Sequence, residues 1–260
     1  MSGPTIAWIS TAPVKGLATQ QHESLELRAS GLAGDRRFHL VDETGRLVNG
    51  KRLGLLVCVT ARYDDGSTLA LAFPGGETVA GEVELGGAVE TGFYGTFRDG
   101  REVLGPWSAA LSEHAGVSLR LIHGTREGAG LDRDVAAAVS LLSLASLGRL
   151  AEVLGVPELD QRRFRMGIGI AGVRPHEEDE WFGRRVRIGD AVIEPHAHIG
   201  RCAVTKLDPE TGVPTLDTLG AIKHYRSEIA SEEALPFGVQ ARVLEPGRVA
   251  VGDPLVVESS

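Results

Sequence analysis

Short apolar segments separated by glycine-containing turns fill the first hundred residues of this 260-residue chain, which has 34 glycines. The turns contain Thr-Gly, Asp-Gly and Pro-Gly pairs. Closely spaced strands with such turns favour a β-barrel or a sandwich over units in which helices alternate with parallel strands. Strands are predicted at residues 6–9, 24–27, 38–41, 55–60 and 69–71.

Three helices and a final group of strands complete the expected fold. Helices are predicted at 107–114, between Pro106 and Gly116; from a cap at Ser143 or Ser146 to Leu154, before Gly155; and after Asp217, through Leu219, Ile222 and Tyr225. Strands return at 238–244 and within 249–257, with a turn at 252–254. We therefore expect a mostly β protein with a few helices. We expect two linked β-barrel-like modules, residues 1–120 and 121–260, whose boundary lies in the glycine- and charge-rich stretch 124–134.

The charge balance restricts the partners that the chain can have. It has 27 basic and 35 acidic residues, a net charge of −8. Nucleic acids and anionic membranes attract basic surfaces, so neither is an expected partner. The sequence has no stretch of about 20 apolar residues and no apolar leader after Met1. We expect a cytoplasmic monomer that acts on a small molecule.

The two cysteines lie in different surroundings. Cys58 follows an apolar run and is expected to be a small core residue. Cys202 follows Arg201, with His196 and His198 shortly before it. Nearby positive charge lowers the pKa of a thiol and makes the thiolate available as a nucleophile or a metal ligand. Cys202 is therefore the candidate reactive centre, and no disulfide is expected in a reducing compartment.

One glycine motif is interpreted as accidental. Gly167, Gly169 and Gly172 have the spacing of a dinucleotide-binding turn. That spacing is informative only between a strand and a helix. Val173-Arg174-Pro175 follows the motif and cannot begin such a helix cleanly. We do not expect a nucleotide site at these glycines.

Several cationic residues follow turn-forming residues. Lys15 follows Pro13-Val14, the pair Arg36 and Arg37 follows Gly34-Asp35, and Arg165 ends a run of three arginines and one phenylalanine. Arginine binds anions as a bidentate fork and lysine as a point charge. The alternative is that each arginine forms a nearly neutral surface ion pair with a nearby acid. The acidic run 177–180 is expected to be a solvated loop rather than a metal site.

These motifs together resemble the MOSC domain proteins, relatives of the C-terminal domain of molybdenum cofactor sulfurase and of the mitochondrial amidoxime reducing component. The resemblance covers nearly the whole chain, and its most specific part is the run from Arg201-Cys202 to Asp208-Pro209-Glu210-Thr211-Gly212. The other matching motifs are Pro13-Val14-Lys15, Gly34-Asp35-Arg36-Arg37-Phe38, Phe164-Arg165 and Glu177-Glu178-Asp179-Glu180-Trp181.

The resemblance implies a molybdenum cofactor, molybdopterin, with Cys202 as the thiolate ligand of the metal. It implies that Lys15, Arg36 or Arg37, and Arg165 grip the phosphate and pterin of the cofactor, with Ser143 as a further candidate. Asp208 is expected to shape the substrate mouth or to fix the Cys202 loop through an Asp-Pro turn. His196 or His198 is expected to deliver protons.

Two positions depart from the family pattern. Met166-Gly167 stands where the family has Pro-Asn, and Gly16 stands where a serine is usual. Both changes remove hydrogen-bond donors without removing charge.

The expected activity is the two-electron reduction of N-oxygenated compounds, such as N-hydroxylated bases. Two cysteines cannot hold an ordinary iron–sulfur cluster, so a separate electron-transfer protein is expected as partner. Three alternatives stay open. The first is sulfur transfer or C–S bond cleavage at Cys202, without a redox metal or pyridoxal phosphate. The second is a non-catalytic carrier of the cofactor. The third is a zinc site formed by His196, His198 and Cys202.

Overall fold

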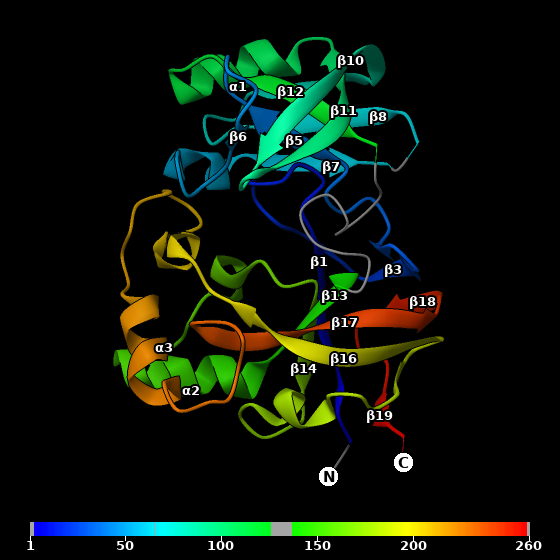
Figure 1. Cartoon of the computed structure of the whole chain (residues 1–260), viewed down its shortest axis with the longest axis vertical. Coiled ribbons are helices and arrows are strands. Elements are labelled where there is room, and N and C mark those ends of the chain that lie inside the picture. Colours follow the sequence, from blue (N-terminus) through cyan, green and yellow to red (C-terminus); the bar gives the residue numbers. More distant parts are fainter. Residues whose placement is uncertain (1–2, 65, 126–136, 259–260) are drawn as a thin grey trace.

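A computed structural model of the chain describes residues 3–64, 66–125 and 137–258. These residues form two lobes, one above the other (Figure 1). The upper lobe contains α1 (Trp107–Ala115) and small sheets. The lower lobe contains α2 (Leu144–Leu154), α3 (Thr218–Arg226) and the largest sheet. The fold is mostly β with three α-helices in the described part of the chain, as the sequence predicts.

The largest sheet has eight strands, and it joins the beginning of the chain to its end. The strands, in spatial order, are β19 (Leu255–Val257), β15 (Val186–Ile188), β16 (Ala191–Gly200), β17 (Pro236–Glu245), β13 (Val139–Ser143), β14 (Ile168–Ala171), β1 (Thr5–Thr11) and β2 (Gln20–His22). Strands β13 and β14 are parallel, and the other neighbours are antiparallel.

Three smaller sheets complete the described strands. One contains β10 (Glu84–Phe93), β11 (Thr96–Leu104), β12 (Arg120–Gly124), β5 (Phe38–Val41) and β6 (Leu47–Val48). The second contains β18 (Gly247–Ala250), β3 (Ser24–Arg28) and β4 (Gly31–Leu32), and the third contains β7 (Thr60–Tyr63), β8 (Thr68–Ala72) and β9 (Thr78–Glu82).

The strand orders are open, so the expected pair of linked barrels is not confirmed. In the largest sheet an isolated bridge between Thr5 and Pro254 joins β1 to the segment before β19, but it is a bridge and not a ladder of strand pairs. The division at residue 120 stays a prediction. Strands β1 and β2 belong to the sheet of the lower lobe, and most of residues 124–134 lies outside the described residues.

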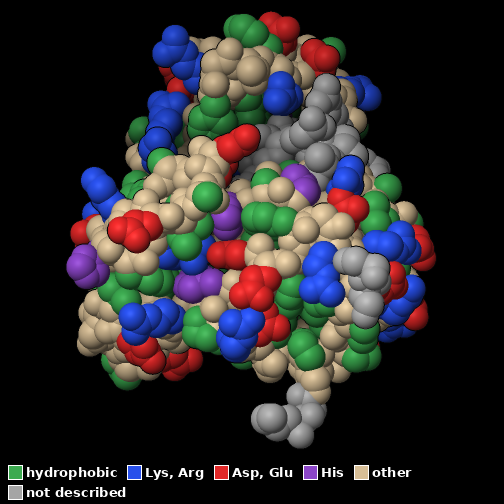
Figure 2. Space-filling model, turned by 60° about the horizontal axis from the view of Figure 1, so that its bottom comes forward, with side chains coloured by type: hydrophobic (Ala, Val, Ile, Leu, Met, Phe, Trp, Pro, Cys, Tyr) green, Lys and Arg blue, Asp and Glu red, His purple; other side chains and the backbone are tan. Residues whose placement is uncertain are grey.

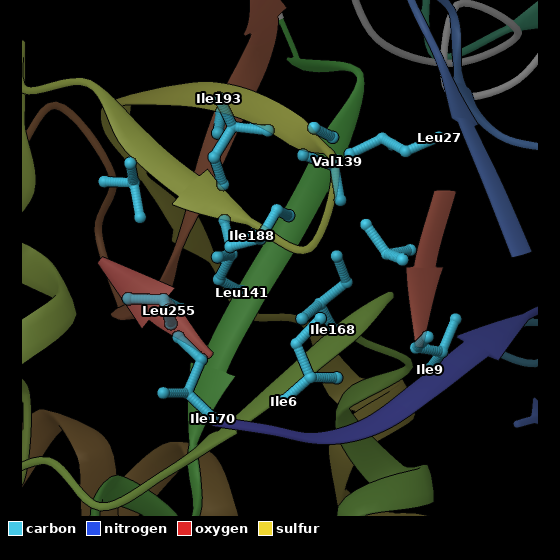
Figure 3. Close-up of a cluster of buried hydrophobic side chains, with 14 of the residues drawn as sticks. Ile6, Ile9, Leu27, Val139, Leu141, Ile168, Ile170, Ile188, Ile193 and Leu255 are labelled. Carbon is cyan, nitrogen blue, oxygen red and sulfur yellow. The ribbon is translucent and has the colours of Figure 1, made fainter. Parts of the chain in front are cut away.

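The core of the lower lobe is formed by branched aliphatic side chains from several strands. In Figure 3 the side chains of Ile6, Leu141, Ile168 and Leu255 point toward one another from β1, β13, β14 and β19. Each is at most 2% exposed. Such β-branched and aliphatic residues suit a sheet face that is fully buried.

The helix predictions are confirmed, and one strand prediction, at residues 55–60, is wrong. Ser143 caps α2 by accepting a hydrogen bond from Ser146, and Asp217 caps α3. Residues 55–60 do not form one strand. The segment Gly54–Cys58 is a 3-10 helix, η1, and β7 begins only at Thr60. Residues 249–257 are divided between β18 and β19 by the predicted turn.

The glycine motif lies in β14 (Ile168–Ala171) and leads into no α-helix, which agrees with its interpretation as accidental. Gly169 leaves room for the indole of Trp8, since a Cβ atom there would lie 1.8 Å from Trp8 Cε3. The glycine at position 169 is therefore explained by packing. Three further 3-10 helices complete the described helical elements, η4 (Gln161–Phe164), η5 (Glu177–Trp181) and η6 (Ala203–Lys206).

The helices of the described chain are all too short or too polar to cross a bilayer.

Candidate active site

A pocket has walls from both halves of the chain. The space within it measures about 1070 Å³, part of it open to solvent. Four of the residues expected at a cofactor site line it, namely Lys15, Arg36, Arg165 and Cys202. The pocket brings together cations and a thiol that are up to 187 positions apart in the sequence, and β1, the strand before Lys15, pairs with β14 of the largest sheet.

Cys202 lies directly before η6, and it is exposed. Thr205 donates two hydrogen bonds to the carbonyl oxygen of Cys202, one from its backbone N–H and one from its hydroxyl, each 3.1 Å long. The Thr205 hydroxyl also lies 2.7 Å from the hydroxyl of Thr218 at the start of α3. The backbone of Cys202 is therefore held while its side chain stays accessible.

Arg201 connects the Cys202 loop to β17, to η4 and to Met166. Its Nε donates to the carbonyl oxygen of Phe237 at 2.7 Å, and its Nη1 donates to that of Phe164 at 3.1 Å. Its Nη2 lies 2.8 Å from Sδ of Met166. Met166 is 3% exposed, so it serves as a buried contact for the Arg201 guanidinium at the position where the family has proline.

Arg163 holds the other end of the Cys202 loop. It is 7% exposed. It donates to the carbonyl oxygens of Lys206 (3.0 Å) and Leu207 (2.7 Å) and to the hydroxyl of Thr215 (2.8 Å). It also lies 3.3 Å from the carboxylate of Asp208. A buried guanidinium that reaches four acceptors through its Nη1 and Nη2 fixes this part of the backbone.

Asp208 stabilises the turn that follows Cys202. Its Oδ1 accepts from the backbone N–H groups of Glu210 and Thr211, both at 3.0 Å. Asp208 is not among the described residues that line the pocket. The geometry therefore matches the expected Asp-Pro turn better than a role at the substrate mouth.

Lys15 and Arg36 line the pocket from the N-terminal part of the chain. The N–H of Lys15 donates to the carbonyl oxygen of Phe38 at 2.8 Å, which places Lys15 beside β5. Arg36 forms an ion pair with Asp35, and Asp35 also accepts from the N–H of Ala12 at 2.7 Å. Both cations therefore project from a stretch of chain that is fixed by backbone hydrogen bonds.

Besides Asp208, three further expected site residues lie elsewhere. Arg37 contacts His123, with 3.1 Å between Nη2 and Nε2. Ser143 is fully buried, and its hydroxyl accepts from the N–H of Ser146 as the cap of α2. His198 is 7% exposed, with its Nε2 3.5 Å from Oδ2 of Asp179. All three are outside the set of described residues that line the pocket.

The acidic run 177–180 is not the solvated loop that was expected. Glu178 is fully buried, and its Oε1 accepts from the N–H of Ser143 and the hydroxyl of Ser146 at 3.1 and 2.8 Å. Burial raises the pKa of Glu178. Asp179 forms an ion pair of 2.7 Å with Arg226, which is 3% exposed. The run is a structural anchor for α2 and α3.

The zinc alternative gains no support from this arrangement. Among the described residues, no group of three or more histidine, cysteine, aspartate or glutamate side chains could hold a metal ion. His198 contacts Asp179 and the ring of Phe182, whose centroid lies 4.9 Å from that of the imidazole.

Other arginines form the surface ion pairs that the sequence allows. Arg162 contacts Asp160 at 2.7 Å and Glu210 at 2.6 Å, and Arg174 contacts Glu180 at 3.0 Å. Acidic and basic side chains are interspersed over the lower end of the molecule (Figure 2). These arginines are therefore structural or solvated rather than aimed at a ligand.

Cys58 is half-buried and not a full core residue. It lines a second hollow beside the first, and both hollows share Arg163, Arg165 and Val204. Burial, with the negative charges of Glu210 and Asp208, raises the pKa of the Cys58 thiol. Both cysteines are free, as expected, and Cys202 is the more accessible of the two.

The sequence interpretation missed three pocket residues, Asn49, Lys51 and Tyr94. Asn49 donates from Nδ2 to the hydroxyl of Tyr94 at 2.7 Å, and Nζ of Lys15 lies 5.7 Å from the centre of the Tyr94 ring. The sequence offered one signal for Tyr94, which stands with Gly95 between two strands. Two-residue hairpin turns favour asparagine, aspartate or glycine at the first position, so a tyrosine there is unusual.

Two family models match the chain. The MOSC domain model matches residues 112–256, and the model of the MOSC N-terminal beta barrel domain matches residues 3–97. Mitochondrial amidoxime-reducing component 1 of Xenopus laevis is 27% identical over 275 residues, which cover 94% of this chain and 79% of the relative. Mitochondrial amidoxime reducing component 2 of Bos taurus is 25% identical over 280 residues, which cover 96% and 82%. The human component 1 is 36% identical over 121 residues, which cover 44% and 35%.

Proposed function

Because the chain belongs to the MOSC domain family, we propose that it is a molybdenum-cofactor-dependent oxidoreductase that reduces N-oxygenated small molecules, with Cys202 as the ligand of the metal. The observation that carries the proposal is the exposed thiol of Cys202 in a pocket that it shares with Lys15, Arg36 and Arg165. The relatives named as amidoxime-reducing components support a reductase at the level of the family.

The residues of the pocket fit the chemistry of such a cofactor. A thiolate is a soft ligand that suits a soft, redox-active metal. Lysine and arginine side chains bind phosphate by charge and by hydrogen bonds. Lys15, Arg36 and Arg165 would hold the anionic part of the cofactor, and Cys202 would bind the metal. When bound, the cofactor supplies the two-electron redox chemistry.

The chain itself supplies positioning. Thr205 holds the carbonyl oxygen of Cys202, and Arg201 and Arg163 hold the two ends of its loop. These bonds fix the place of the thiol before any ligand binds, which reduces the entropy cost of binding. Arg37, Ser143, Asp208 and His198 have no part in this proposal, since they are not among the described residues that line the pocket.

The electron donor is proposed to be a separate protein. The chain has only two cysteines, and they differ in accessibility, so it cannot hold an ordinary iron–sulfur cluster. The relatives are named as mitochondrial, and the expected cytoplasmic location and monomeric state of this chain stay predictions.

The test is to purify the chain from a molybdenum-replete host and to measure molybdenum and pterin per chain. We expect stoichiometric amounts of both, loss of the metal in Cys202→Ser and its retention in the matched control Cys58→Ser. With a chemical reductant, the loaded protein should reduce an N-hydroxylated amidine. Complete absence of metal and pterin from the wild-type protein would contradict the proposal.

The same preparation separates the alternatives. A metal-free protein with a persulfide on Cys202 would instead indicate sulfur transfer. Bound cofactor without turnover of any N-oxygenated compound would indicate a carrier. Stoichiometric zinc without pterin would indicate the site of histidines and cysteine.

A further inference from the structure

Backbone strain concentrates at the pocket. In the described part of the chain, four residues other than glycine have a positive φ, and three of them, Arg36 (49°), Tyr94 (44°) and Arg165 (56°), line this pocket. A positive φ is unfavourable for a residue with a large side chain. Residues held in such conformations cluster at functional sites. Arg36 and Arg165 already have a proposed role, whereas Tyr94 has none.

Tyr94 occupies a turn that does not favour tyrosine. It lies with Gly95 between β10 and β11, whose residues Phe93 and Thr96 pair on either side. Both turn residues have positive φ, 44° for Tyr94 and 88° for Gly95. Two-residue turns of this kind favour asparagine, aspartate or glycine at the first position. The local fold therefore does not explain why tyrosine is present.

The contacts of Tyr94 point to Lys15. The ammonium nitrogen of Lys15 lies 5.7 Å from the centre of the Tyr94 ring, within the range of a cation–π interaction. Asn49 donates to the Tyr94 hydroxyl at 2.7 Å and so restrains the ring. Tyr94 is 68% exposed, which means that the ring is not placed there to fill a core.

We propose that Tyr94 is a positioning residue that seats the ammonium group of Lys15 for the anionic group bound in the pocket, and that Asn49 holds the Tyr94 ring in place. The inference rests on the proposed function, in which that anionic group is the phosphate of the cofactor. A free lysine side chain loses considerable rotamer entropy when it is ordered. A ring that orders the ammonium in advance reduces this cost and tightens binding of the anion.

The first test compares Tyr94→Asn with Phe97→Thr in the full chain, stripped of cofactor. Phe97 is an exposed aromatic residue of the same hairpin, 67% exposed, and is not among the described residues that line the pocket. With inorganic phosphate as the probe, Tyr94→Asn should raise the dissociation constant by about two- to fivefold, the effect of one exposed cation–π contact. Phe97→Thr should leave it unchanged.

Thermal unfolding separates this role from a structural one. Asparagine before glycine is favoured in this turn, so Tyr94→Asn should unfold at the same temperature as the wild type or at a higher one. Weaker phosphate binding in a protein that is no less stable is the expected result. Unchanged phosphate binding in Tyr94→Asn would overturn the inference, as would failure of the wild-type protein to bind phosphate.

A double-mutant cycle tests whether Tyr94 acts through Lys15. If it does, Tyr94→Asn has no further effect on phosphate binding in a Lys15→Ala background. An equal effect in both backgrounds would contradict the inference. A wild-type protein that binds phosphate through Lys15 and Tyr94, but contains no pterin or molybdenum, would contradict the proposed function alone.

Discussion

The guanidinium group of Arg163 donates to the carbonyl oxygen of Leu207 at 2.7 Å and so joins η4 to the segment that follows Cys202. The same side chain reaches Lys206, Asp208 and Thr215. One buried arginine thus serves as the common donor for a loop that has little other regular structure. The neighbouring Arg162 has a different environment, since it is paired with acids near the surface.

Replacing Arg163 by methionine should lower the free energy of unfolding by about 2–4 kcal/mol. The variant would leave several buried acceptors and the Asp208 carboxylate without their donor, and such losses cost more than the bond itself contributes. Urea unfolding followed by circular dichroism measures the change. Arg162→Met is the matched control, and it should cost no more than about 1 kcal/mol because exposed ion pairs contribute little. Equal losses in the two variants would contradict this account.

His176 should make the protein less stable in acid. Burial, together with the positive charge of Arg226, lowers the pKa of His176 from 6.5 to about 4. Between these values the unfolded chain binds a proton that the folded chain does not, so the free energy of unfolding falls as the pH falls from 6.5 toward 4. Across this pH range, the free energy of unfolding of His176→Gln should fall less steeply than that of the wild type, as measured by unfolding experiments.

The control for His176 is the exposed His224, which lies in the last turn of α3. His224→Gln should keep the pH dependence of the wild type. If the free energy of unfolding of His176→Gln falls with pH as steeply as that of the wild type, the imidazole of His176 is not responsible for the loss of stability in acid.

Gly169→Ala should strongly destabilise the lower lobe. The added Cβ would lie 1.8 Å from Cε3 of Trp8, whose side chain is 5% exposed and cannot move into solvent without loss of packing. Overpacking of a core costs about 1–3 kcal/mol, occasionally more. The shift of Trp8 should also be visible in its fluorescence. A variant as stable as the wild type would show that the indole can move aside at no cost.

Gly148→Ala should have the opposite effect. Gly148 lies within α2, and a Cβ atom there would meet nothing within 4 Å. Alanine in an exposed helix position is favoured over glycine by about 1 kcal/mol. Thermal unfolding should therefore show a higher midpoint for Gly148→Ala, and a lower midpoint would contradict the helical environment described for this residue.

The helices could be predicted because their boundaries are encoded locally. The hydroxyl of Ser143 and the carboxylate of Asp217 satisfy N–H groups of the first turns, and Gly116 and Gly155 adopt the left-handed conformation that ends a helix. Such signals need no knowledge of the rest of the fold. Four strands of the first hundred residues, β1, β3, β5 and β8, were predicted in the same way, from their turns, whereas β2, β4, β6, β9, β10 and β11 were not predicted.

The error at residues 55–60 has a tertiary cause. A short apolar run can be a strand or part of a helix, and its periodicity does not decide between them. Here Gly54 lies close to Gly212, since a Cβ atom on Gly54 would be 2.1 Å from the carbonyl oxygen of Gly212. The 3-10 turn of η1 is thus packed against the loop after Cys202, 158 positions from Gly54 in the sequence.

The candidate site was predictable only in part. Lys15, Arg36, Arg165 and Cys202 belong to motifs, and the pocket unites them. The sequence could not choose between Arg36 and Arg37, because only the folded chain shows that Arg36 lines the pocket and that Arg37 contacts His123. The sequence marks Tyr94-Gly95 as an unusual turn but does not place it beside Lys15, since the β10–β11 hairpin contacts Lys15 only in the folded chain.

The pairing of β1 with β14 also governs the order of events during synthesis. The indole of Trp8 donates to the carbonyl oxygen of Met166, which the ribosome adds 158 residues later. At about 5–20 residues per second, this interval lasts about 8–30 s. Until then β2 can cover only Ile9 to Thr11 of the first strand. The edge of β1 that pairs with β14 therefore stays unpaired during this interval. We expect the yield of folded protein to depend on how that edge is protected on the ribosome.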